Sequence, residues 1–165
     1  MGVDLAEMME ANKRLALDAG WAVQNEELTF VVPLEIEGAT IPLNLRGKTY
    51  LRQPDRNVML QVEFVPDIGK TEPLSRFDWK PFHTHNNRNR GPAKWRFIPL
   101  NQTHVHAFNL NWLADDKKMI GKNLPVATPL EADPSFTEML AILKQKFKIL
   151  NASEIPPPPW ERRLI

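Results

Sequence analysis

The four histidines of the chain form two His-x-His pairs that lie close together in the sequence. The pairs are His83-Thr84-His85 and His104-Val105-His106. Residues two apart on a β-strand point to the same face of a sheet, so each pair would present two imidazoles side by side. Histidine titrates near neutral pH, and two imidazoles can supply a general base and a general acid. This chemistry makes His85, His104 and His106 the predicted catalytic residues.

The segment that contains both pairs is rich in positive charge. From Trp79 to Ala114 it has five Lys and Arg residues and no Asp or Glu, whereas the whole chain has a net charge of only +1. Amide and aromatic side chains are interleaved with these cations. Such a mixture suits a surface that binds a phosphate backbone and stacks bases. The predicted nucleic-acid-binding residues are Lys80, Arg88, Arg90, Lys94, Trp95 and Arg96.

These features together predict a protein that binds the backbone of RNA and acts as a metal-independent ribonuclease. RNA is the favoured nucleic acid because its 2′-hydroxyl is a nucleophile within the substrate itself. Histidines would transfer protons, and neighbouring cations would stabilise the charge that develops on the phosphate. We expect no cofactor.

A metal site is one alternative use of the same histidines, because imidazoles also bind zinc, nickel or iron(II). The segment itself contains no acidic ligand, so Glu63 or Asp78 would have to come from another element. Its five cations would also repel a divalent ion, and this electrostatic argument favours acid–base chemistry. If a metal is bound, the predicted ligands are His83, His85, His104 and His106.

Other interpretations need no chemistry at the histidines, which could be ordinary surface residues. The protein could be a non-enzymatic, phage- or defence-linked inhibitor whose basic segment docks on an acidic protein surface. The C-terminal tail offers another contact, because four consecutive prolines precede Trp160 and favour a polyproline II conformation. That tail could dock on a cognate protein partner, or Trp160 could anchor it to its own domain.

Length and composition bound the class of protein. A chain of 165 residues is expected to form one domain, here residues 1–150, followed by the Pro-rich tail at 151–165. The absence of cysteine excludes disulfide scaffolds and thiolate chemistry. We find no secretory signal and no apolar run of about 18 residues, so we expect a cytoplasmic protein that does not enter a membrane.

Hydrophobic periodicity predicts the elements that must position the histidines. The pattern favours a helix over residues 4–19 and a second helix that is capped by Asp133, has Pro134 at its first position and carries its apolar stripe at 136–147. A hairpin is expected from 28–34 and 40–46 with its turn at Glu37-Gly38, and residues 66–80 are expected to be a loop. Further strands are expected at 57–65, 79–85, 94–100 and 103–110. The predicted fold class is α+β, a mainly antiparallel sheet of about five or six strands flanked by an N-terminal and a C-terminal helix.

A motif order in the second half of the chain resembles a known group of proteins. The order is the strand Val58–Phe64, a loop, the turn His85-Asn86-Asn87 and the segment Thr103–Asn109, with the helix at 136–147 after it. Residues 57–150 thereby resemble small bacterial and phage proteins with a closing His-x-His-aliphatic-Tyr strand, some looser relatives of which are toxins of toxin–antitoxin pairs. This chain has Phe108 in place of the Tyr. The resemblance implies that His85, His104 and His106 belong to a shared site.

Overall fold

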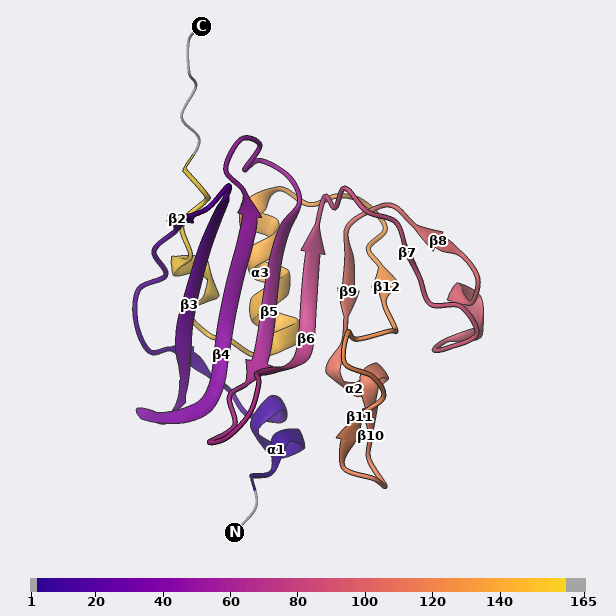
Figure 1. Ribbon diagram of the computed structural model, residues 1–165, viewed down its shortest axis with the longest axis horizontal. Coiled ribbons are helices and arrows are strands. Elements are labelled where there is room, and N and C mark those ends of the chain that lie inside the picture. The colour runs from indigo at the N-terminus through magenta and orange to yellow at the C-terminus, as the bar shows by residue number, and fades with distance from the viewer. Residues whose placement is uncertain (1–2, 160–165) are drawn as a thin grey trace, which may run out of the picture.

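The computed structural model describes residues 3–159 and has an α+β fold (Figure 1). The helices are α1 (Leu5–Glu10), α2 (Phe108–Asn111) and α3 (Phe136–Phe147), with 3₁₀ turns η1 (Ala93–Trp95) and η2 (Ala152–Glu154). The longer strands are β3 (Glu27–Ile36), β4 (Ala39–Tyr50), β5 (Val58–Phe64) and β6 (Glu72–Trp79). The shorter strands are β1 (Arg14–Leu15), β2 (Ala22–Gln24), β7 (His85–Asn86), β8 (Pro99–Leu100), β9 (His104–His106), β10 (Trp112–Leu113), β11 (Lys118–Met119) and β12 (Thr128–Pro129).

The predicted fold class is confirmed, and the main sheet is larger than expected. It has eight strands, in the order β1-β3-β4-β5-β6-β9-β12 with β2 also paired to β3, and its ladders are antiparallel. The β3–β4 hairpin turns at Glu37 and Gly38 as predicted. Both residues have positive φ, 50° and 81°, which is the conformation of the tight turns that match strand twist.

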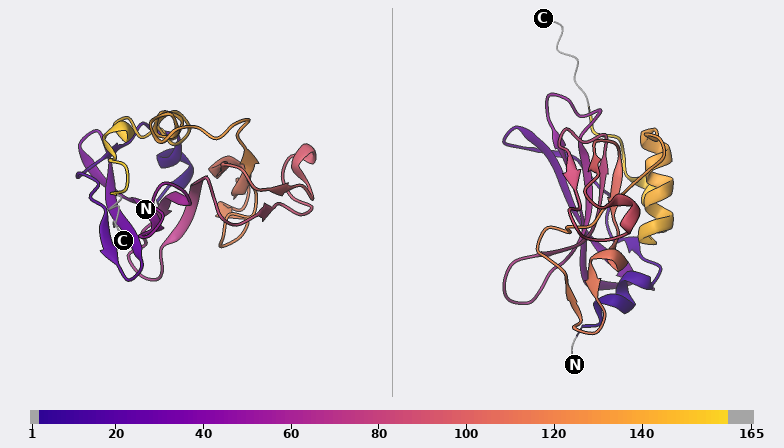
Figure 2. Two further views of the ribbon diagram at one scale, coloured as in Figure 1. Left: turned by 90° about the horizontal axis from the view of Figure 1, so that it is seen from above. Right: turned by 90° about the vertical axis from the view of Figure 1, so that its right-hand side faces the viewer.

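The sheet has one face covered by apolar packing and one face that is polar. Alternate residues of β3, β4 and β5 are buried against α3, which lies along one side of the sheet (Figure 2). This alternation follows from the two-residue period of a strand, and it gives the buried face its hydrophobic core. Helix α3 contributes Met139, Leu140, Leu143 and Phe147 to that core. No helix of residues 3–159 covers the opposite face of the sheet, which is called the open face below.

Two of the predicted elements near the N-terminus and the middle of the chain are wrong. The first helix ends at Glu10 instead of continuing to residue 19, and the chain then pairs with β3 through β1. The predicted loop at 66–80 contains the strand β6. Its alternation is hidden in the sequence because Pro73 and a register shift opposite Val62 and Glu63 interrupt the two-residue period.

The predicted strands around the histidines are shorter and more irregular than expected. Residues 79–85 form no continuous strand, 94–100 divide into η1 and β8, and 103–110 divide into β9 and α2. Helix α3 has the predicted place, but Ser135 is its N-cap, with its hydroxyl accepting from the Glu138 N–H at 3.1 Å. Asp133 instead accepts hydrogen bonds from the backbone and hydroxyl of Thr103.

The packed region continues beyond residue 150. Ala152 and Ile155 are buried in the core, and the Trp21 indole donates to the Pro156 carbonyl at 2.7 Å. Trp160, the predicted anchor of the tail, lies outside the described residues. Within residues 3–159 no helix is long and apolar enough to cross a membrane.

A buried lysine closes the end of α1. The Lys13 side chain is fully buried, and its Nζ donates to the carbonyls of Met8, Met9 and Ala11 at 3.1, 2.9 and 2.8 Å. Burial lowers the pKa of Lys13 to about 8, so the ammonium keeps its charge and all three donors at neutral pH. The helix therefore ends where this side chain satisfies carbonyls that lack a partner in the next turn.

We expect Lys13→Met to lower the free energy of unfolding by about 1–3 kcal/mol, because three carbonyls, one of them in a buried contact, lose their donor while the apolar volume is kept. Urea unfolding at pH 7 measures the change. Lys70→Met, at an exposed lysine of the β5–β6 loop, is the matched control and should change stability little. Equal stability of the Lys13 variant and the wild type would show that the capping contacts contribute nothing.

Candidate functional site

Strand pairing places one acidic and one basic side chain directly opposite the second histidine pair. In the β6–β9 ladder Asp78 pairs with His104 and Arg76 pairs with His106. The residues between them, Phe77 and Val105, point into the core and are buried. Arg76, Asp78 and both histidines therefore share the open face of the sheet. The sequence suggests Asp78 only as a possible acidic ligand from another element, and that element is β6.

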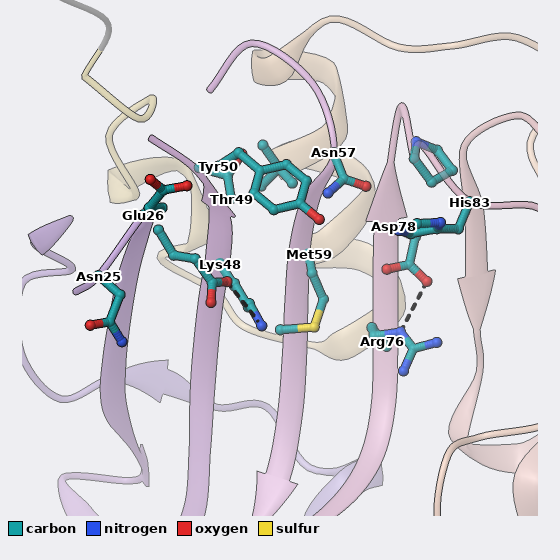
Figure 3. A pocket seen from close by; sticks show the side chains of 13 residues that line it. Asn25, Glu26, Lys48, Thr49, Tyr50, Asn57, Met59, Arg76, Asp78 and His83 are labelled. Carbon is teal, nitrogen blue, oxygen red and sulfur yellow. Dashed lines mark hydrogen bonds and ion pairs between the residues drawn. The ribbon is translucent and has the colours of Figure 1, made fainter. Parts of the chain in front are cut away.

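The Asp78 carboxylate is the centre of this group. Its Oδ2 lies 2.9 Å from Arg76 Nε, 3.2 Å from His104 Nε2 and 3.1 Å from His106 Nε2. Burial alone would raise the pKa of Asp78, but a hydrogen bond from His104 and the charge of Arg76 hold it well below its usual range. The carboxylate is therefore ionised at neutral pH. Figure 3 shows the Arg76–Asp78 pair on β6.

The two histidines of β9 each have one ring nitrogen bonded to the backbone. His104 Nδ1 lies 2.8 Å from the Gln102 carbonyl, and His106 Nδ1 lies 2.6 Å from the Leu124 carbonyl. A carbonyl only accepts, so both Nδ1 atoms carry hydrogen and both Nε2 atoms face Asp78. Burial lowers the pKa of His106 to about 4, so at neutral pH its Nε2 lone pair accepts from Arg76 Nη2 at 3.1 Å.

His85 joins this group from strand β7. Its ring centroid lies 4.7 Å from that of His106 and 5.6 Å from that of His104. His85 Nε2 lies 2.8 Å from Asn87 Oδ1 and 3.1 Å from the Pro125 carbonyl, two acceptors that require an N–H. The neutral ring therefore keeps its lone pair on Nδ1, for which no other part of residues 3–159 provides a hydrogen-bond partner. Burial lowers the pKa of His85, which favours this neutral form.

Four consecutive residues, Leu124–Ala127, hold these side chains in place, and we call them the strap. The Leu124 carbonyl accepts from His106 and the Pro125 carbonyl accepts from His85. Both backbone groups of Val126 bond the Asn111 amide, and both backbone groups of Ala127 bond the Asn87 amide, at 2.8–2.9 Å. Asn87 and Asn111 are buried, so these two amides have a structural role that the composition of the segment did not reveal.

A cleft of about 480 Å³ opens beside His85. Arg76, Arg88 and Arg90 place three positive charges around it, and we call it the cationic cleft. It is the part of the structure where two of the predicted phosphate-binding residues, Arg88 and Arg90, lie beside His85. Its lining is completed by Asn86, Asn87, Asn123 and Pro125.

The remaining predicted binding residues lie elsewhere on the surface. The segment 87–98 connects β7 to β8, and we call it the finger. Lys94 and Arg96 are exposed in the finger, and Lys94 Nζ lies 4.8 Å from the centroid of the Trp95 ring. Lys80 Nζ lies 4.7 Å from the Trp79 ring. The cationic cleft is not lined by any of the four predicted binding residues Lys80, Lys94, Trp95 and Arg96.

His83 lies apart from the other three histidines. It is exposed and lines a second cleft, of about 550 Å³, on the open face. Arg76 and Asp78 line this second cleft too (Figure 3), and Arg76 lines both clefts. The structure thus brings His85, His104 and His106 together and leaves His83 at the rim.

One set of side chains in the described residues could hold a metal ion. The ligand atoms of Asp78, His104 and His106 all lie within 4.8 Å of one another. The set differs from the four histidines expected from the sequence, because Asp78 takes part and His83 does not. Glu63, the other acid considered, pairs with Arg46 at 2.9 Å.

We expect the free energy of unfolding to fall as the pH drops from about 6.5 to 4. The unfolded chain protonates His106 near 6.5, whereas the folded chain does so only near 4, so protons favour the unfolded state in that window. The loss is at most about 3 kcal/mol at about 1.4 kcal/mol per pH unit. His85 acts in the same direction, and Asp78 stabilises the fold until the pH falls below about 4.

Urea unfolding between pH 7 and 4 measures this slope. His106→Gln should flatten it, and His83→Gln, at the exposed histidine, should leave it in place. A wild-type stability that stays constant from pH 6.5 to 4.5 would contradict the buried, neutral state of His106.

Comparisons with other proteins provide no family and no function by similarity. No family model matches the chain, and no curated protein or solved structure matches it. The resemblance to phage and toxin proteins stays a prediction from the motif order. The geometry of the cluster and of its two clefts is therefore the basis for the functional argument.

Proposed function

We propose that this protein binds the phosphate backbone of RNA in the cationic cleft and cleaves it by proton transfer to His85. The observation that carries this proposal is the position of His85: its Nδ1 lone pair is unpartnered in the described residues, and its ring lines the same cleft as Arg76, Arg88 and Arg90. A base and three phosphate-binding cations thus converge on one cleft.

The charges around the cleft support an anionic ligand. Arg88 and Arg90 come from the acid-free segment 79–114, and their guanidinium groups can bind phosphate oxygens through two hydrogen bonds. Arg76 is held by Asp78 Oδ2 and His106 Nε2 and is preorganised beside His85. Cations that are fixed before the reaction stabilise developing charge without reorganisation.

The cleavage step follows from this placement. His85 Nδ1 accepts the proton of the 2′-hydroxyl, and the 2′-oxygen forms a bond to phosphorus. The bond from phosphorus to the 5′-oxygen breaks, and the departing oxygen takes a proton from water. Arg76 neutralises the extra charge on the phosphate oxygens. The products are a cyclic phosphate and a 5′-hydroxyl, and no metal takes part.

Burial assigns different roles to the other two histidines. His104 and His106 are 2% and 0% exposed, so a polynucleotide in the cleft reaches His85 before it reaches either of them. They contact Asp78, and His106 contacts Arg76. We therefore assign them positioning roles: they orient the carboxylate and the guanidinium that face the substrate.

We expect His85→Ala to reduce cleavage of a single-stranded RNA in EDTA by about 10²–10⁴-fold, the usual contribution of a general base. His83→Ala removes an exposed histidine outside the cluster and is the matched control, which should keep wild-type activity. His104→Ala should lower the rate while RNA binding persists, because Arg88 and Arg90 remain. The assay follows formation of the cyclic phosphate.

The same assay separates this function from a non-enzymatic one. An inhibitor that docks on an acidic protein surface would show no cleavage with the wild type and would be indifferent to His85→Ala. A cleavage rate in EDTA that is equal for the wild type and His85→Ala would refute the proposed chemistry.

We expect the double variant Arg88→Glu, Arg90→Glu to weaken RNA binding and to reduce its salt dependence. Each lost phosphate contact on a single strand lowers the slope of log K against log salt by about 0.7. Fluorescence anisotropy between 50 and 300 mM salt measures both effects. Lys70→Glu is the control for net charge, and an equal loss with that variant would show that the cleft is not the binding surface.

A further inference from the structure

We infer that Asp78 Oδ2, His104 Nε2 and His106 Nε2 form a site for one divalent transition metal of the zinc–iron group. The site is distinct in chemistry from the proposed cleavage, which uses His85 and no metal. It also differs from the four-histidine site that the sequence suggested, since its third ligand is a carboxylate. Two imidazoles and one carboxylate are a ligand set that zinc and iron(II) accept, with positions left open.

The two separations between the carboxylate oxygen and the imidazole nitrogens fit a common metal. Oδ2 lies 3.2 Å from His104 Nε2 and 3.1 Å from His106 Nε2. Ligands that are each about 2.0–2.1 Å from one ion are separated by about 2.9 Å in an octahedral site and about 3.3 Å in a tetrahedral site. Both contacts fall in that range. A metal held by the carboxylate and either imidazole therefore needs little movement of those two ligands, and all three ligand atoms lie within 4.8 Å of one another.

The hydrogen bonds of the two rings also prepare them for a metal. Each Nδ1–H donates to a backbone carbonyl, of Gln102 or of Leu124, so each Nε2 atom faces the carboxylate. A metal-bound histidine characteristically donates its other N–H in this way, which orients the ring and raises its basicity. The carboxylate only accepts, so its 3.2 Å contact with His104 Nε2 requires a hydrogen on that nitrogen or a cation between the two atoms, and a metal would take the place of that hydrogen.

Arg76 is the competitor of the metal. Its guanidinium now donates to Asp78 Oδ2 and to His106 Nε2, two of the three ligand atoms. No bond from Arg76 to His104 Nε2 exists in the structure, so the guanidinium satisfies the site only in part. A metal must displace these two contacts, and Arg76 lines both clefts, into which its side chain can turn.

The local charge is less hostile to a metal than the composition suggests. Of the five cations in the segment 79–114, Lys80, Lys94 and Arg96 do not line either cleft. Asp78 adds a negative charge from β6 at the centre of the group. The repulsion of a divalent ion by the five cations of this segment is therefore weaker at the three ligands than the sequence suggests.

Cobalt(II) and zinc test the site directly. Untagged protein is stripped with EDTA, and the visible absorption of Co²⁺ is followed to saturation, with Zn²⁺ then added in competition. We expect one ion per chain. Asp78→Asn and His104→Ala should weaken binding by more than about 100-fold, which exceeds the loss typical of a hydrogen bond to a ligand. His83→Ala is the matched control and should bind like the wild type.

Arg76→Met provides a test in the opposite direction. It removes the competing guanidinium and keeps the side-chain volume, so metal binding should become tighter by about tenfold or more, which corresponds to about 1.4 kcal/mol. A variant that misfolds cannot bind more tightly, so this result does not depend on loss of function. Circular dichroism checks the fold of each variant.

Absence of a Co²⁺ spectrum at millimolar metal, or the same affinity in wild type and Asp78→Asn, would overturn the site. Binding is measured without RNA, so a failure of the proposed cleavage leaves this test intact. One consequence does depend on the proposed function: metal binding should release Arg76 and slow cleavage. Cleavage that rises with metal would instead overturn the metal-free mechanism and place the metal at its centre.

Discussion

The candidate site depends on a strap of four residues whose backbone groups bond to side chains instead of to a neighbouring strand. Buried peptide groups must be paired, and an unpaired one costs about 1–3 kcal/mol. In the strap, two carbonyls are paired by His106 and His85, and two peptide units are paired by Asn111 and Asn87. The same bonds that satisfy the strap therefore fix which ring nitrogen of His85 and of His106 points away from it.

The register of β6 against β9 is the second constraint on the site. Phe77 and Val105 face the core, so a shift of one residue would bury the charged side chains and expose the apolar ones. Hydrophobic packing on one face thus determines that Asp78 lies opposite His104 on the other. Packing of the apolar residues in the core therefore fixes the β6–β9 register that brings the polar side chains together.

Part of this structure could be predicted from the sequence. The β3–β4 hairpin, strand β5 and helix α3 follow from strong local periodicity and turn residues. The His-x-His spacing predicts that His104 and His106 share one face of a strand, as they do on β9. The ring of His85 lies beside both of them. The spacing did not distinguish His83, because the chain between it and β7 is irregular and the two-residue rule holds only within a strand.

The acid of the cluster was harder to predict for a specific reason. Asp78 belongs to a strand whose alternation is broken by Pro73 and by a register shift, so its face could not be read from the sequence. The strap was also hidden, since Asn87 and Asn111 lie 40 and 15 residues from the peptides that they bond. Contacts of this separation depend on the assembled sheet. Local patterns carry no information about them.

Helix α3 lies behind β4–β6, whereas β9, β12 and the β7–β8 finger extend beyond it (Figures 1 and 2). The part of the sheet that carries the candidate site is thus joined to the rest mainly through one edge, that of β6. Such a region can open as a cooperative unit of its own while the helix-covered half stays folded. Any molecule that binds there would first slow the exchange of amide hydrogens across β9 and the strap, before it changed the melting of the whole chain.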